Sequence, residues 1–532
     1  MKNLVGRDIP EQFLKDGKEV FQGQHYRDGY TYKKASPTVR SYMKPSEGKL
    51  ASSLEEAIKQ SGLKDGMTVS FHHHFRDGDY VVNMVMDAIH QLGIRDITIC
   101  ASSLGTAHAP IVKYIEDGTI TGISSSGVRG EIGDAISSGK LKNPAFIRSH
   151  GGRVRAIETG DIHIDVAFIG APTSDAFGNA RGKGGKSDCG VLSYSMVDAK
   201  YADKVVVITD TLVPFPNYPP SIEHIDVDHV VVVPEIGNPK KIANALLRFT
   251  TDPRELLIAE YATKALVSTP YFKDNFSFQT GGGGPSLAVT RFLKPYMLEK
   301  NIKMGFAIGG ITKPMIDLLE EGLIKTIVDA QDFDLTSIAS VHDHPRHFEI
   351  STSQYANPMN KGAFVNQLDF VILGALEVDT DFNVNVITGS DGVVRGAPGG
   401  HVDTAAGAKC SIIVAPLVRS RIPTIKDSVI TVTTPGESVD IVVTEVGVAI
   451  NPRRQDLLDA LKDSGLPLMT IEELRDEAYA LVGKPEEIEF LDQVVALVEY
   501  RDGTLIDVIR KPKPVTLSSI CCLLYTSPSP RD

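Results

Sequence analysis

The sequence repeats itself once, and this internal repeat limits the folds that the chain can adopt. Ile164 to Asn179 (IDVAFIGAPTSDAFGN) aligns with Leu368 to Asn383 (LDFVILGALEVDTDFN) at an offset of 204 residues, with five identical positions. Ser70 to Asp79 aligns with Ser277 to Ser286 at an offset of 207 residues. Matches in the same order at nearly the same offset indicate two related halves.

Within each half, strand-like runs alternate with helical runs. MTVSFHHHF (residues 67–75) predicts a strand, VVNMVMDAIHQLG (81–93) a helix that ends at its glycine, and DITICASS (96–103) the next strand. Ser53 is expected to cap another helix, because Glu56 follows at the capping-box spacing. Such alternation with short loops is typical of parallel βαβ units. The predicted fold is therefore α/β, with two homologous halves, each a mainly parallel open sheet with helices on both faces.

The same patterns predict the boundaries of the parts. Residues 1–50 are polar and aperiodic, and are expected to form an arm that lies on the body or docks a partner. The first half is expected at 51–270 and the second at 271–514, with the active site in the cleft between them. Residues 515–532 lack periodicity and end in CLLYTSPSPRD, which resembles translated adapter sequence, so we interpret them as a non-native tail.

Composition excludes several classes of function. The 532 residues carry a net charge of −12, which argues against nucleic acid as a partner. No apolar run reaches the roughly 20 residues that span a bilayer, and the N-terminus lacks the apolar core of a signal peptide, so we expect a cytoplasmic protein. No metal site is expected either. Cys100, Cys189 and Cys410 are scattered, and consecutive strand residues such as 72–74 point to opposite faces.

Three glycine clusters in the second half are the candidate ligand contacts. Gly281, Gly282, Gly283 and Gly284 precede a helical run, Gly309 and Gly310 end a strand-like run, and Gly399 and Gly400 precede His401. Free amides at such turns suit a phosphate, a carboxylate or the oxyanion of an acyl adduct. Neither a Walker A motif nor a dinucleotide fingerprint is present. A flexible surface loop is the alternative interpretation of the first cluster.

Residues from about 54 to 507 resemble the α subunit of citrate lyase. The matching segments include DGMTVSFHH, VNMVMD, SHGGRV, IDVAFIG, TDPRELLIA, QTGGGG, SLAVTRFL, FNVNVITGSDGVVRGAPGGH, SIIVAPLVRSRIPT and VDIVVTEVGVAINP. The resemblance implies a CoA-transferase-type fold. It also implies that citrate displaces acetate from an acetyl thioester, giving citryl thioester within the complex that cleaves citrate to acetate and oxaloacetate.

The resemblance further implies partners and cofactors. A lyase β subunit and a small γ acyl carrier protein are expected in an oligomeric complex, with citrate and acetate as the small molecules. The chain itself is expected to bind no cofactor and to use CoA, or the CoA-like prosthetic group of the carrier protein. Gly281 to Gly284 would hold the pantetheine arm and the thioester.

The same resemblance shapes the catalytic candidates. Related CoA-transferases carry a covalent glutamate where this chain has Gly309 and Gly310, so we expect exchange through a bound mixed anhydride, with these glycines as ligand contacts. Glu377 is the alternative nucleophile, although its counterpart in the first half is Thr173. His401 is expected to bond a substrate carboxylate or the thioester oxygen.

Citrate carries three carboxylates, so arginines should line its pocket. The candidates are Arg76, Arg129, Arg395, Arg419 and Arg421. Asn383 is a further candidate for substrate binding, or, with Asp379, a brace for a turn that the first half repeats as Asp175 and Asn179.

Three other functions stay open from sequence. One is the α subunit of a citramalate lyase, and a second is another acyl-CoA:carboxylate CoA-transferase. The third, non-enzymatic, is an acyl-CoA-binding sensor or scaffold subunit, although no basic helix-turn-helix segment is evident.

Overall fold

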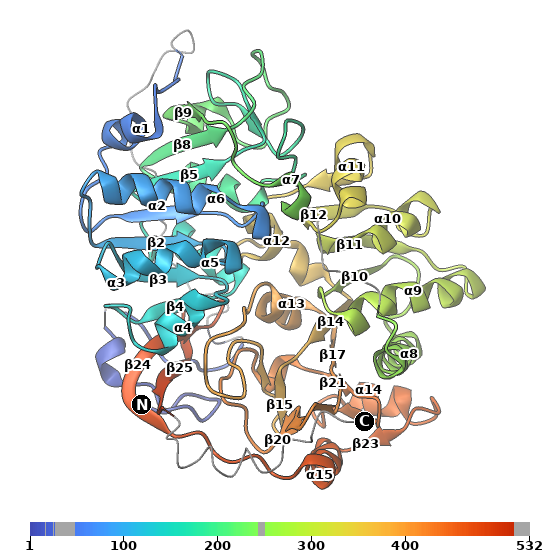
Figure 1. The fold of residues 1–532 in the computed structure, drawn as a ribbon. Helices are drawn as coiled ribbons and strands as arrows, with labels where there is room; N and C mark the ends of the chain where they lie inside the picture. Colours follow the sequence, from blue (N-terminus) through green and yellow to red (C-terminus); the bar gives the residue numbers. More distant parts are fainter. Residues whose placement is uncertain (16, 25, 27–47, 243–249, 515–532) are drawn as a thin grey trace, which may run out of the picture.

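A computed structural model describes all residues except 16, 25, 27–47, 243–249 and 515–532 (Figure 1). The predicted non-native tail and most of the second part of the predicted arm therefore lie outside the described residues. Two nine-stranded sheets form the body, one in each half.

The first sheet has the strand order β25-β24-β4-β3-β2-β1-β5-β8-β9. Its strands in chain order are β1 (Thr68–Phe71), β2 (Ile97–Ala101), β3 (Ile120–Ser125), β4 (Ala145–Arg148), β5 (Val166–Gly170), β8 (Lys204–Thr209), β9 (His229–Val232), β24 (Phe490–Glu499) and β25 (Leu505–Pro512). All neighbours pair in parallel except the terminal hairpin of β24 and β25.

The second sheet has the order β13-β12-β11-β10-β14-β17-β21-β22-β23. Its strands are β10 (Phe276–Thr280), β11 (Met304–Ile311), β12 (Ile327–Asp332), β13 (His347–Glu349), β14 (Phe370–Gly374), β17 (Cys410–Val414), β21 (Ile441–Val443), β22 (Val448–Ile450) and β23 (Leu468–Met469). Only β21 and β22 pair antiparallel.

The two sheets share one strand order over seven positions, which confirms the internal repeat. The order β4-β3-β2-β1-β5-β8-β9 of the first sheet corresponds to β13-β12-β11-β10-β14-β17-β21 of the second. Even single contacts recur: Asp165 Oδ2 accepts from Thr68 N at 2.7 Å, and Asp369 Oδ2 accepts from Ser277 N at 2.9 Å. The predicted fold class, two related α/β halves with mainly parallel sheets, is confirmed.

Helices cover the sheets. In the first half they are α1 (Leu54–Ser61), α2 (Val81–Gln91), α3 (Val112–Glu116), α4 (Glu131–Ser137), α5 (His150–Thr159), α6 (Ser193–Tyr201) and α7 (Pro239–Ile242). Ser53 caps α1 by accepting from Glu56 N at 3.2 Å, as predicted. Those that follow are α8 (Pro253–Ser268), α9 (Gly284–Glu299), α10 (Lys313–Glu320), α11 (Leu335–Asp343), α12 (Thr352–Ala356), α13 (His401–Gly407), α14 (Gln455–Leu461) and α15 (Ile471–Val482). Among the described residues, no helix is both long and apolar enough to cross a membrane.

The halves differ from the predicted boundaries at two points. Helix α8 lies within 51–270, yet its apolar face packs in the core of the second sheet beside α9. The hairpin of β24 and β25 lies within 271–514, yet β24 pairs with β4 and extends the first sheet. Without the hairpin, β4 would be an exposed edge strand, and covering it satisfies its free backbone groups.

The first part of the N-terminal arm lies on the body, beside this hairpin. Ile9 and Val20 pack with Leu497 and Leu505 in a small apolar cluster. Lys18 forms an ion pair with the buried Glu499. The described residues at the start of the arm therefore lie on the body, which is one of the two arrangements expected for it.

Candidate active site

A cavity of about 790 Å³ opens between the two halves. The carboxyl ends of β1, β10, β11, β12 and β14 and the starts of α5, α9 and α13 surround it, the edge at which parallel sheets place ligands. Sites for small molecules typically have volumes of about 300–1,000 Å³. The position agrees with the predicted cleft between the halves.

The cavity is cationic, although the chain as a whole is acidic. Among the described residues that line it, five are lysine or arginine and one, Asp77, is a carboxylate. The five cations are Arg76, Arg129, Lys241, Arg395 and Arg419. This wall is therefore suited to a ligand with several negative charges.

Arg76, one of the predicted arginines, is partly buried between the two halves. It follows β1, has φ +51°, and its guanidinium lies 3.8 Å from the centroid of the Phe333 ring of the other half. Burial lowers the pKa of Arg76 to about 10, so it stays charged at neutral pH. Its Nε is buried and has no hydrogen-bond partner among the described residues.

Three of the other predicted arginines differ in whether they line the cavity and in how exposed they are. Arg419 lines the cavity and donates to the carbonyl oxygens of Ala375 and Leu376. Arg395 lines the rim, with its side chain 49% exposed and bonded to Asp391 at 2.6 Å. Arg421 is exposed and lies outside the cavity lining.

All three predicted glycine clusters reach the cavity, but not every glycine of the first cluster does. Gly281, Gly282 and Gly283 line it, whereas Gly284 begins α9 and packs close to Glu255. The Gly281 amide donates to Ile372 O at 2.7 Å and so is not free. The open amides of this segment therefore come from the residues just before the first turn of α9.

Gly309 and Gly310 line the cavity at the end of β11, and neither position has room for a side chain. A Cβ on Gly310 would lie 1.6 Å from Cε2 of Phe333. Gly309 has φ +104°, and its Cβ would meet the Gln279 amide at 2.7 Å. A glutamate at either position would therefore require Phe333 or Gln279 to move.

The segment Gly396 to His401 crosses from the second half and docks on the first. Gly399 N donates to Ser126 O at 3.1 Å, and His150 N donates to Gly399 O at 2.7 Å. Gly399, Gly400 and His401 all line the cavity. Because its amide is bonded to Ser126, however, Gly399 offers no free N–H to a ligand.

Both ring nitrogens of His401 are hydrogen-bonded within the protein. The sequence had predicted a hydrogen bond from this ring to the substrate. Its Nε2 lies 2.9 Å from Gly374 O and its Nδ1 lies 2.7 Å from Thr434 Oγ1. Burial lowers the pKa of His401 to about 4, so the ring is neutral. Both nitrogens are occupied, and the ring ties the start of α13 to the end of β14.

Glu377 and Asn383, candidates for catalysis and substrate binding, lie outside the cavity lining and are bonded within the protein. Glu377 pairs with Lys426 and accepts from Asn385 Nδ2 at 2.9 Å. Asn383 Nδ2 donates to Asp379 Oδ2 at 3.2 Å, while the matching turn joins Asn179 to Asp175. Both side chains brace turns at strand ends, as the sequence already allowed for Asn383.

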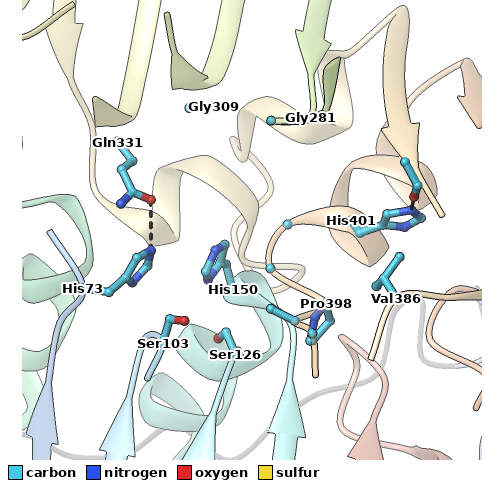
Figure 2. Close-up of a pocket in the computed structure, with 18 of the residues that line it drawn as sticks. His73, Ser103, Ser126, His150, Gly281, Gly309, Gln331, Val386, Pro398 and His401 are labelled. Atoms are coloured by element: carbon cyan, nitrogen blue, oxygen red, sulfur yellow. Dashed lines mark hydrogen bonds between the residues drawn. The ribbon is translucent and has the colours of Figure 1, made fainter. Parts of the chain in front are cut away.

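Four residues of the first half line the cavity but were not among the predicted site residues: His73, His150, Tyr194 and Ser126. His73 follows β1, with Nδ1 2.6 Å from Ser102 Oγ and Nε2 2.9 Å from Gln331 Oε1 of the other half (Figure 2). His150 begins α5 and stacks on His73 with ring centroids 5.6 Å apart. The SHGGRV motif was the available signal for His150.

One buried group beside the cavity could hold a metal ion. Asp329, Asp332 and His347 offer ligand atoms within 4.8 Å of one another. His347 Nε2 already lies 3.0 Å from Asp329 Oδ2, and its Nδ1 lies 3.0 Å from Ser340 Oγ. Burial raises the pKa of Asp329 to about 7, and burial with the Asp329 charge raises the pKa of Asp332 well above its ordinary value. At least one carboxyl of the pair therefore holds a proton near neutral pH.

Comparisons with known proteins agree with one another. Residues 47–512 match the family model described as citrate lyase, alpha subunit (CitF). The citrate lyase alpha chain of Haemophilus influenzae is 56% identical over 465 residues, which cover 87% of this chain and 93% of that one. A crystal structure from Streptococcus mutans, described as the putative alpha subunit of citrate lyase in complex with citrate, is 57% identical, with TM-score 0.94. It covers 96% of this chain and 100% of its own.

A more distant structure is similar in fold alone. The malonate decarboxylase alpha subunit of Acinetobacter baumannii is 15% identical, with TM-score 0.61 over 82% of this chain and 87% of that one.

Proposed function

The chain belongs to the citrate lyase alpha subunit (CitF) family, and we propose that its central cavity exchanges acetate for citrate on a partner's thioester. The observation that carries the proposal is the charge of the cavity wall: five cations and one carboxylate among the described lining residues. A tricarboxylate needs such a surplus of cations. The similar protein from Streptococcus mutans was solved with citrate, which supports the same ligand here.

The exchange takes place in two acyl transfers. A carboxylate oxygen of citrate adds to the acetyl thioester carbon, the C–S bond breaks, and an acetyl-citryl anhydride and a thiolate result. The thiolate then adds to the citryl carbonyl of the anhydride, and acetate leaves with the bridging oxygen. No proton is consumed, so the protein has to orient the reactants and stabilise each oxyanion.

A covalent enzyme glutamate has no place in this scheme. Packing leaves no room for a side chain at Gly309 or Gly310, and Glu377 is held by Lys426 away from the cavity. The one lining carboxylate of the described residues, Asp77, accepts from Thr106 Oγ1 at 3.0 Å. These contacts support direct attack by citrate.

The thioester reaches the cavity on CoA or on a CoA-like group of a small acyl carrier protein. Gly281 to Gly283 form the part of the wall where the acyl end would lie against backbone. A lyase β subunit would then take the citryl thioester for cleavage. This assembly is proposed from family membership.

The test uses the purified chain with acetyl-CoA and labelled citrate, with citryl-CoA and acetate measured together. Arg76→Gln is expected to raise the KM for citrate about tenfold or more, because a buried charged contact is worth about 1.5–3 kcal/mol. Arg421→Gln is the matched control, because Arg421 is exposed and off the cavity. Absence of citryl-CoA with or without carrier, or equal KM in both variants, contradicts the proposal. A higher kcat/KM for citramalate than for citrate favours the citramalate alternative.

A further inference from the structure

Four histidines line the cavity, and three of them have both ring nitrogens bonded within the protein. His73 lies between Ser102 and Gln331, and His401 between Thr434 and Gly374. His108 accepts from Gly105 N and bonds Asp79 through Nε2, each at 3.0 Å. The ring of His150 is different, since its Nδ1 is buried and has no hydrogen-bond partner among the described residues. It is therefore the imidazole that remains available to a substrate.

The packing around His150 fixes the direction of its ring. The ring stacks on His73 at an interplanar angle of 11° and meets the edge of Tyr194 with centroids 4.8 Å apart. Its Nδ1 is buried, whereas its Nε2 is directed toward Gly399, 3.6 Å from where a Cβ of that glycine would lie. Figure 2 shows the ring projecting into the space between the halves, below Gly309 and Gly281. A substrate atom in this space reaches Nε2 and not Nδ1.

His150 is an uncharged hydrogen-bonding group. Burial, together with the Arg153 charge, lowers the pKa of His150 to about 3, and its neighbours His73 and Tyr194 are also neutral at physiological pH. A neutral imidazole carries one N–H, which we assign to Nε2 because that nitrogen faces the cavity. The ring can therefore donate to an oxygen without presenting a positive charge to the citrate carboxylates.

Two of the backbone amides at the glycine turns are not available as donors to a substrate. Gly399 N is bonded to Ser126 O and Gly281 N to Ile372 O. A preorganised donor aimed at the developing oxyanion is the largest single contribution to catalysis in many acyl transfers. His150 Nε2 lies beside the Gly399 turn, in a cavity that the segment before α9 also lines.

We propose that His150 donates a hydrogen bond from Nε2 to the carbonyl oxygen of the bound acyl thioester. The inference rests on the proposed function, because it names the group that stabilises the first adduct of that exchange. As the citrate oxygen bonds to the carbonyl carbon, the C=O electron pair moves to this oxygen, which His150 holds until the C–S bond breaks. The proton stays on Nε2 throughout.

The kinetic test compares His150→Ala with His150→Gln, since the Gln amide nitrogen can occupy the place of Nε2. We expect His150→Ala to lower kcat about 100-fold, the usual effect of removing one oxyanion donor, with KM for citrate within about twofold. His150→Gln is expected to recover about tenfold of that loss. A kcat within threefold of wild type in His150→Ala, or a loss confined to KM, overturns the inference.

A spectroscopic test separates this inference from the proposed function. Acetyl-CoA labelled with ¹³C at the carbonyl is bound to the wild-type chain without citrate, and its C=O stretch is measured by isotope-edited infrared difference spectroscopy. We expect a shift to lower frequency in wild type and the free-ligand frequency in His150→Ala.

The outcomes are distinct. If wild type forms no citryl-CoA but shows the His150-dependent shift, the proposed function fails and the hydrogen bond stands. If exchange proceeds and the shift is the same in both proteins, the hydrogen bond fails alone. If wild type binds neither acetyl-CoA nor the acetyl thioester of the carrier protein, both are refuted.

Discussion

Replacing Gly310 by alanine tests whether citrate binding requires a residue without a side chain at the end of β11. The added Cβ would lie 1.6 Å from Cε2 and 2.4 Å from Cζ of Phe333. Carbon atoms in contact normally lie about 3.5–4.0 Å apart, so the ring has to move by about 2 Å. Gly310 has an ordinary backbone conformation, so the substitution acts through this clash and not through φ.

Movement of the Phe333 ring should displace Arg76 and so weaken citrate binding. Its guanidinium lies 3.8 Å from the centroid of the Phe333 ring, an interaction of about 1–2 kcal/mol in a partly buried site. Overpacking of the core costs a further 1–3 kcal/mol or so of stability. Since about 1.4 kcal/mol is a factor of ten in affinity, we expect the KM for citrate to rise about tenfold.

The assay is citrate-dependent release of acetate from acetyl-CoA, measured with urea unfolding of the same preparation. Gly374→Ala is the matched control, because Gly374 also lines the cavity and a Cβ there meets nothing within 4 Å. We expect this control to stay within about twofold of wild type. Equal citrate KM values for Gly310→Ala and Gly374→Ala would refute the reasoning.

Three further predictions concern residues outside the reacting centre. Glu377→Gln should keep kcat within about threefold. It should lose about 3 kcal/mol of stability in urea unfolding, because it leaves Lys426 as an unpaired buried charge. A hydroxylamine-sensitive acyl-enzyme at Glu377 would contradict this structural role. Asn383→Ala should lose about 1–3 kcal/mol of unfolding free energy with kcat/KM per folded molecule unchanged, and a selective loss of citrate affinity would argue for a substrate contact. Burial and the Asp329 charge raise the pKa of Asp332 well above its ordinary 3.8 in the folded state, so wild type should lose stability relative to Asp332→Asn as pH rises above about 4, by up to roughly 1.4 kcal/mol per unit. A stability difference that is constant with pH would show that folding does not raise the pKa of Asp332.

The arrangement of the sheets was largely predictable because the repeat encodes it. Strands at offsets of 204 and 207 residues occupy the same positions in the two sheets, as β5 and β14 or β1 and β10 do. The place of β24 was not predictable. It pairs with β4, some 350 residues earlier in the chain, and an apolar run does not show which of two similar sheets it will extend.

The glycines and Arg76 of the site could be found from sequence, but the role of each histidine could not. His401 stands in the most distinctive motif, yet its ring is occupied by Thr434 and by Gly374 O, partners that only the folded chain brings near. The role proposed for His150 depends on the absence of a partner for its Nδ1 among the described residues, and a missing partner leaves no trace in a sequence. Nor could the sequence show that the Gly399 amide is bonded to Ser126 O of the other half.

The most direct test of the direct-attack scheme follows the oxygen atoms of citrate. Citrate labelled with ¹⁸O in its carboxylates is mixed with acetyl-CoA and excess chain, and the acetate of a single turnover is analysed by mass spectrometry. Direct attack within the cavity predicts that each acetate carries one oxygen from citrate. Unlabelled acetate in the first turnover, or acetate released before citrate is added, would show that an enzyme group or water attacks first, and would contradict the account.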